Sequence, residues 1–534
     1  MRRFPFPYAL LSLFLVACGD DEPAAPADDD GQGAGSTGAG AEGGGGAAPQ
    51  PGEVDAVAAP TRTTVTIDVV GSIETAPLEP AAFVITSDRG PLTVEAVAVE
   101  GQRLTLTTEK QKLGVTYELA IAAAGSDFDL QGGSFLAADT AVFWATDFED
   151  FDDYEVTARR VGVGEHVVLY ATDDVTATDV DETIQVFDSI VYPKEVELLH
   201  AAPDRDDNGK ILLLGLDGGG YYGGYFSPVN TLTQEEAEEW GTHSNEMEML
   251  YISVPALDDK FDPYGVIPHE LSHLLYQEEH GGFSDWSWHN EGLAECAVQA
   301  VHGANDYAAY WYLNWPSLAA GESLVKWTYS NYAQYAQAYV FWTYAASRLG
   351  GTQAYAQLFD QAGDPANMNG FFQAELGVSL TDMQVDMMTA AWVGAPTGDY
   401  GFNGLLVLGG QPQSSPAATS LDLLPFEGVF LTGAAGQVSP SGQGPDVRYR
   451  AIDAGGNVDD AAPFSADGGV IIAVNTVQNP ALNDTEPSGT FPAALPPPVL
   501  GPPVLGRDPA WRHPPPVAPW NRSKLERWRA QTRR

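Results

Sequence analysis

Cysteine is almost absent from this sequence, which has only Cys18 and Cys296 in 534 residues. If Cys18 is modified, no disulfide can form within the chain, and Cys296 is then a lone thiol of the kind that is usually small, buried and apolar. Disulfides then do not organise the fold. Hydrophobic residues make up 44% of the chain, which is enough for sizeable buried cores.

Positive charge is also scarce, because 25 Lys and Arg stand against 73 Asp and Glu, for a net charge of −48. A surface this acidic repels nucleic acid and anionic lipid. We therefore expect no nucleic-acid partner, and membrane contact only through a covalent lipid. The composition suits a soluble secreted protein, for which we expect a monomer, and it leaves spare carboxylates for calcium.

Long apolar runs are missing too, and the run at Tyr8 to Val16 is too short to span a bilayer. It follows Arg2 and Arg3 and ends at Cys18, as a cleaved signal does. This end resembles the lipobox of bacterial lipoproteins, which implies a signal peptide at 1–17 and a lipidated Cys18. The expected location is the cell envelope or the outside of the cell. An ordinary signal that contains a cysteine is the alternative.

Large apolar residues are nearly absent from the segment after Cys18, so we predict a flexible tether over 18–62. The end of the chain, 481–534, is Pro-rich. From Gly501 onward it carries eight basic residues against two acidic ones. We predict a disordered end there and assign it no function.

Two regions have the alternating pattern of β-strands. The first, 63–140, includes Thr64 to Val70, Arg103 to Thr107 and Tyr117 to Ile121, and it resembles bacterial immunoglobulin-like modules. The second, 395–480, predicts a small β domain. The region between them, 141–394, mixes short apolar runs with helical spacing, and Gly303 and Gly350 are expected to end helices.

All the chemistry that we find lies in 141–394, beginning with His269-Glu270-Leu271-Ser272-His273. Positions i and i+4 share one helix face, so both imidazoles can reach one metal ion, with Glu270 beside them to hold a water. Pro268 stands directly before the motif and disfavours the helical state at Ile267, although proline is tolerated in a first turn.

A catalytic zinc needs a third protein ligand. The pattern that uses a third histidine requires Gly at 276 and His at 279, where this chain has Tyr276 and Glu279. The pattern that uses a glutamate on a second helix fits Asn290-Glu291, with Glu295 one turn later. We predict that Glu291 binds zinc and that Glu295 orients a ligand histidine. The alternative for both is a solvated helix face.

These motifs resemble the gluzincins, the thermolysin-like clan, and more narrowly the hyicolysin family of bacterial metallopeptidases. The resemblance implies peptide-bond hydrolysis and an α+β zincin-type domain, flanked here by the immunoglobulin-like β-sandwich and the small β domain. It also implies a Tyr or His oxyanion donor on a later helix. Of the candidates Tyr329, Tyr332, Tyr335 and Tyr339, we choose Tyr335, which heads the stretch that resembles the family. The matching stretches, besides the zinc motif, lie at 168–174, 187–193, 204–211, 223–226, 244–251, 290–292 and 335–341.

Two further stretches bear on ligands. Asp204-x-Asp206-x-Asn208-Gly209 opens like a calcium loop, but Gly215 stands where an EF-hand requires Glu, so a polar turn is the preferred interpretation and Ca²⁺ stays a candidate.

The alternating segment from Glu246 to Ser253 predicts a strand, and gluzincins pair substrate with an edge strand before the zinc helix. We therefore take Asn245, Glu246 and Glu248 as candidate substrate contacts, with an ordinary sheet strand as the alternative.

The function that these features predict is that of a zinc metalloendopeptidase acting on proteins or peptides, with Glu270 as the base for zinc-activated water. One alternative is an aminopeptidase, in which Glu246 or Glu248 anchors the substrate amine. The other is a tethered binding or adhesion protein whose zinc domain is inactive, against which the intact Glu270 argues.

Overall fold

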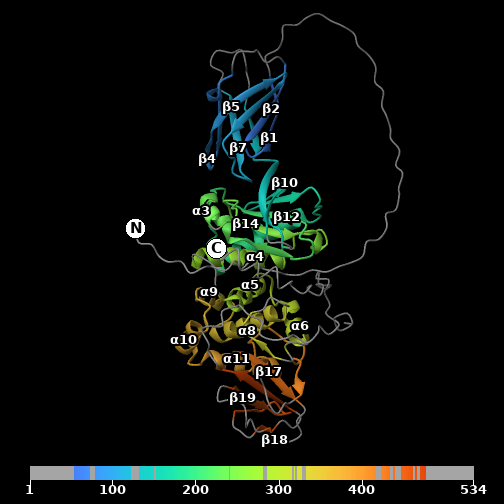
Figure 1. Ribbon diagram of the computed structural model, residues 1–534, viewed down its shortest axis with the longest axis vertical. Coiled ribbons are helices and arrows are strands. Elements are labelled where there is room, and N and C mark those ends of the chain that lie inside the picture. Colours follow the sequence, from blue (N-terminus) through green and yellow to red (C-terminus); the bar gives the residue numbers. More distant parts are fainter. Residues whose placement is uncertain are drawn as a thin grey trace, which may run out of the picture.

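The computed structural model describes residues 53–476, apart from short internal segments. The expected signal peptide, Cys18 and the basic tail all lie outside the described residues. The segments left out are 72–77, 122–131, 149–151, 240, 281–285, 316–317, 319–320, 328–331, 417–422, 433–436, 439–446, 461–463 and 466–468. From the amino to the carboxyl end, a β module, a central sheet with helices and a second group of strands follow one another along the long axis (Figure 1).

The first module consists of two antiparallel sheets that enclose one core. In β2, Val65 and Ile67 face inward while Thr64 and Thr66 alternate with them, as a half-buried strand requires. Its strands are β1 (Glu53–Thr61), β2 (Thr64–Val70), β3 (Phe83–Ser87), β4 (Gly90–Leu92), β5 (Val94–Glu100), β6 (Arg103–Thr108), β7 (Thr116–Ile121) and β8 (Gly133–Leu136).

Strand β1 corrects the predicted boundary of the tether. It pairs with β2 along most of its length and lies within the segment, 18–62, that was predicted to be flexible. Its sequence is rich in alanine and has few large side chains, so hydropathy alone missed it. The pairing partner, which comes two residues later, supplies the hydrogen bonds and the core.

The central sheet has the strand order β13-β14-β12-β11-β10-β9. Strands β11, β12 and β14 run parallel and are almost wholly buried, because alternate side chains enter separate cores on the two faces. The strands are β9 (Thr140–Thr146), β10 (Asp153–Val163), β11 (Val167–Thr172), β12 (Ile211–Leu216), β13 (Gly224–Phe226) and β14 (Met249–Ser253).

Helices pack on one face of this sheet and continue below it (Figure 1). The predicted stops at Gly303 and Gly350 are confirmed as the C-caps of α5 and α8. The bounds are α1 (Val180–Val186), α2 (Tyr192–Leu198), α3 (Gln234–Glu239), α4 (Val266–His280), α5 (Ser287–His302), α6 (Asp306–Asn314), α8 (Ala333–Leu349), α9 (Ala354–Phe359), α10 (Pro365–Leu376) and α11 (Leu380–Val393). In the described part of the chain, no helix has the length and apolarity needed to cross a membrane.

The carboxyl-terminal strands share a core with the helices. Helix α11 ends at Val393 and is capped by Gly394, where the domain boundary was predicted, but Ile472 and Val474 of the following sheet belong to the same core as α11. Arg450 also pairs with Asp386 of α11. The strands are β15 (Glu322–Ser323), β16 (Ser415–Pro416), β17 (Glu427–Thr432), β18 (Gln437–Val438), β19 (Val447–Ile452), β20 (Val458–Asp459), β21 (Phe464–Ser465) and β22 (Val470–Asn475).

Candidate metal centre

Helix α4 carries the histidine motif. It begins at Val266, two residues before Pro268, so the proline lies in the first turn, where its missing N–H removes no helical hydrogen bond. The carboxylate of Asp262 accepts hydrogen bonds from the backbone N–H groups of Gly265 and Val266 and caps this end. Leu271 and Leu275 anchor the helix in the core. The doubt that Pro268 raised about the start of the helix is thereby removed.

Helix α5 brings the second half of the constellation. It begins at Ser287 and places Glu291 and Glu295 one turn apart. Gly292 lies where a Cβ atom would come within 2.4 Å of Trp342 on α8. Glycine therefore allows α5 and α8 to approach closely, and this contact fixes the position of Glu291.

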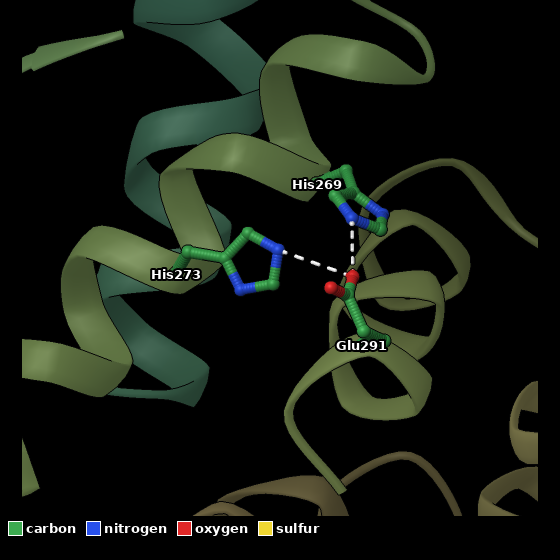
Figure 2. Close-up of side chains that lie close together, drawn as sticks. All are labelled: His269, His273 and Glu291. Atoms are coloured by element: carbon green, nitrogen blue, oxygen red, sulfur yellow. Dashed lines mark hydrogen bonds and ion pairs between the residues drawn. The ribbon is translucent and has the colours of Figure 1, made fainter. Parts of the chain in front are cut away.

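The structure brings His269, His273 and Glu291 together (Figure 2). The Nε2 atom of His269 is 3.3 Å from Oε2 of Glu291, and Nε2 of His273 is 3.5 Å from the same oxygen. All three side chains are buried, and one ligand atom from each lies within 4.8 Å of the others. A solvated helix face, the alternative interpretation for Glu291 and Glu295, is therefore wrong.

The other ring nitrogen of each histidine also faces an acceptor. Nδ1 of His269 is 3.5 Å from Oε1 of Glu295, whose second oxygen accepts a hydrogen bond from Asn305. Nδ1 of His273 is 3.1 Å from the side-chain oxygen of Asn290. These contacts orient both rings with Nε2 toward Glu291. Asn290 had no predicted role beyond its place before Glu291, although each ligand histidine needs such an acceptor.

The electrostatics of the cluster follow from burial and pairing. Burial opposes a charged imidazole, but the Glu291 and Glu295 carboxylates raise the pKa of His269 well above its ordinary value. Burial also opposes an ionised Glu291, but hydrogen bonds from His269 and His273 hold its pKa below the ordinary value. Glu291 therefore stays a carboxylate, the form that binds metal.

Two imidazoles and one carboxylate are a donor set that catalytic zinc uses. Oε1 of Glu291 has no hydrogen-bond partner among the residues that the structure describes. The same is true of each of the two carboxyl oxygens of Glu270. Buried carboxylate oxygens without partners are costly, and a metal ion with a water molecule would satisfy them. Burial raises the pKa of Glu270 to about 8. The residues present therefore fit a zinc ion.

The edge strand beside the cluster is β13. The segment from Glu246 to Ser253, for which the edge position was predicted, contains β14 instead. The outer side of β13 has no paired strand in the described part of the chain, whereas β14 lies between β13 and β12. At Gly224, a Cβ atom would lie 2.4 Å from Val266 and 3.3 Å from Cγ of Glu270. The glycine thus lets the edge strand lie against α4 next to Glu270.

The three candidate substrate contacts lie elsewhere, which corrects the prediction. Strand β14 begins at Met249, after all of them. Asn245 exchanges hydrogen bonds with the backbone of Trp144, and Glu246 pairs with Lys110 of the first module. Glu248 is buried and accepts a hydrogen bond from the backbone N–H of Arg205.

Tyr335 lies on the first turn of α8, with its ring centroid 6.3 Å from that of His269. Tyr332 stacks on Tyr335 at 5.4 Å, and the Tyr339 hydroxyl accepts a hydrogen bond from the backbone N–H of Asn305. Among the tyrosine candidates that the structure describes, Tyr335 is the one whose ring contacts a histidine of the cluster. Tyr329 lies outside the described residues.

Comparison with known proteins supports a relationship to a metalloprotease. The neutral metalloprotease ShpI of Staphylococcus hyicus is 24% identical over 286 residues, which cover 47% of this chain. The chain spans 63% of the length of that protein. No family model matches.

Solved structures of the surface layer protein SbsC are similar to small parts of the chain. The structure of domains 1–6 is 21% identical and covers 18% of this chain and 15% of its own. The structure of the N-terminal part is 18% identical and covers 25% of this chain and 29% of its own. The TM-score is 0.16 in both cases. Such a low score says nothing about the fold.

Proposed function

We propose that this chain is a zinc metalloendopeptidase of the gluzincin type, similar to the hyicolysin family. The observation that carries the proposal is the buried group of His269, His273 and Glu291, with Glu270 beside it on the same helix as the histidines. The relationship to a neutral metalloprotease agrees with it.

His269, His273 and Glu291 would hold a zinc ion, which would supply Lewis-acid chemistry that polarises a peptide carbonyl and lowers the pKa of water. Glu270 takes the proton from the attacking water and delivers it to the leaving amine. Glu295 and Asn290 hold the histidine rings in place. The Tyr335 hydroxyl donates a hydrogen bond to the oxyanion that forms on the scissile carbonyl.

The side of β13 that has no paired strand in the described part of the chain is the proposed place for the substrate backbone. A strand edge without a partner strand offers N–H and C=O groups to an extended peptide. Gly224 brings this edge next to Glu270. A peptide paired with β13 would therefore pass the base. The aminopeptidase alternative loses support, because Glu246 and Glu248, its amine anchors, contact Lys110 and Arg205 instead.

The experiment that tests the function is digestion of casein by the purified chain. The proposal requires cleavage that 1,10-phenanthroline abolishes and about one equivalent of zinc restores. Internal cleavage of peptides with blocked amino ends separates an endopeptidase from an aminopeptidase. A folded, zinc-loaded chain that cleaves neither casein nor gelatin would support the binding-protein alternative instead.

Tyr335→Phe tests the oxyanion donor. Loss of one such donor typically lowers turnover by about 10²–10³. We expect that loss in kcat with little change in KM, because the ring packing against His269 and Tyr332 stays. Zinc content and the thermal unfolding midpoint should match those of the wild type. Tyr339→Phe is the matched control, since its hydroxyl contacts Asn305 instead. Turnover of Tyr335→Phe close to the wild-type value would reject the assignment.

We also propose that the mature chain begins at a lipidated Cys18 and is held at the cell envelope. The apolar run before Cys18 supports this. The wild type is expected to partition into the detergent phase and Cys18→Ser into the aqueous phase. Equal partitioning of the two would refute the anchor.

A further inference from the structure

Three carboxylates gather at the amino-terminal ends of two neighbouring strands, apart from the zinc cluster. Strands β12 and β14 pair in parallel with Leu212 opposite Met249, so the loop before β12 lies beside Glu248. One carboxyl oxygen each of Asp204, Asp206 and Glu248 lies within 4.8 Å of the others. These residues come from two segments that are distant in the sequence.

The loop from Asp204 to Lys210 is held in one shape by its own hydrogen bonds. Asp204 accepts one from the backbone N–H of Gly209 at 2.9 Å, and Asp206 accepts one from the side chain of Asn208 at 2.9 Å. Gly209 has a φ of 70°, which favours glycine. The carboxylates are therefore positioned without a ligand.

Glu248 is the buried member of this group of carboxylates, and one of its carboxyl oxygens lacks a hydrogen bond from the described residues. The residue is only 1% exposed. Oε1 accepts the hydrogen bond from Arg205, but Oε2 has no hydrogen-bond partner among the described residues. A buried carboxylate oxygen without a partner costs free energy unless a cation or a proton satisfies it.

The neighbouring cations do not fill this need. Arg89 pairs with Asp204 and Asp207, and Lys112 pairs with Asp207, so in the described part of the chain neither cation pairs with Asp206 or Glu248. Burial lowers the pKa of Arg62, which Asp206 partly offsets, but no ion pair joins Arg62 to Glu248 in the described part of the chain. Three carboxylates thus share a partly buried site.

We propose that Asp204, Asp206 and Glu248 bind a calcium ion that joins the loop before β12 to the start of β14. The ligands are all hard oxygens, without the nitrogen or sulfur that zinc favours. Calcium also tolerates irregular carboxylate sets, whereas magnesium requires near-octahedral geometry. Because Arg89 and Lys112 of the first β module bind the same loop, the ion also steadies the contact between that module and the central sheet.

The test uses the full chain, stripped by a chelator and reloaded with zinc, and measures Ca²⁺ binding by titration calorimetry and thermal unfolding. We expect about one Ca²⁺ site and a higher unfolding midpoint. Glu248→Gln and Asp206→Asn should lose at least about tenfold in Ca²⁺ affinity, because even the loss of a residue that only orients a ligand typically costs about 10–100-fold. Without calcium, Glu248→Gln should unfold at a higher temperature than the wild type, because it removes a buried charge beside Asp206.

Asp207→Asn is the matched control, because it removes one charge from the same loop outside the cluster and asparagine tolerates the φ of 54° there. It should bind Ca²⁺ like the wild type, and zinc content should be equal in every variant. The proposal is overturned by absence of binding in the wild type, by equal binding in Glu248→Gln and Asp206→Asn, by equal loss in Asp207→Asn, or by Mg²⁺ binding as tightly as Ca²⁺.

Discussion

Glu270→Gln is expected to abolish most proteolysis while the zinc ion stays bound. General acid–base catalysis by one side chain typically contributes about 10²–10⁴ in rate, and glutamine cannot accept the proton of the attacking water. Glu270 is fully buried and is not one of the three grouped metal ligands, so the amide replaces the carboxyl without changing the donor set. The measurement is kcat on an internally quenched peptide, together with zinc content by mass spectrometry.

The matched control is Glu278→Gln. This residue lies near the carboxyl end of the same helix, and its side chain pairs with Arg205. It changes the same chemical group and should leave kcat and zinc content unaltered. Stability gives a further check. Because burial raises the pKa of Glu270 to about 8, its carboxyl is mostly protonated and neutral at pH 7 in the metal-free chain, so the neutral amide should not lower the unfolding midpoint there. A zinc-loaded Glu270→Gln variant with nearly wild-type kcat would show that another group is the base.

The local part of the candidate site could be predicted from the sequence because helical spacing decides it. His269 and His273 are four residues apart on one helix, and so are Glu291 and Glu295, so the side chains that share a face follow from the numbering alone. Helices α4 and α5 must also bring these two faces together. The position of α5 depends on its packing against α8 at Gly292. The sequence contains that glycine, but it does not show what approaches it.

The features that were missed depend on pairing between distant segments. The alternating apolar residues before Ser253 correctly predicted a strand, β14. The position of β14 inside the sheet, however, depends on its pairing with β13, which has only three residues and carries a weak sequence pattern. Strand β1 was missed because its partner, not its own composition, makes it a strand. The cluster of Asp204, Asp206 and Glu248 likewise depends on the parallel register of β12 and β14.

Glu291→Ala is expected to abolish stoichiometric zinc binding and, with it, proteolysis. A catalytic zinc requires three protein ligands, and the hydrogen bonds from both histidines keep Glu291 ionised for this role. The variant leaves two buried imidazoles that still face Glu295 and Asn290, so the rings should keep their orientation while the site lacks an anionic ligand. Zinc per chain after dialysis against a weak chelator measures the loss.

Glu295→Ala separates a ligand from a residue that only positions one. Glu295 lies on the same helix, one turn later, and contacts Nδ1 of His269 rather than the Nε2 atom that faces Glu291. Removal of such a partner typically weakens metal affinity by about 10–100-fold. Zinc should therefore still bind to Glu295→Ala at saturating concentration and restore turnover, whereas no zinc concentration should restore it in Glu291→Ala. If both variants recover equally, Glu291 is not a ligand, because added metal can compensate for a lower affinity but not for an incomplete donor set.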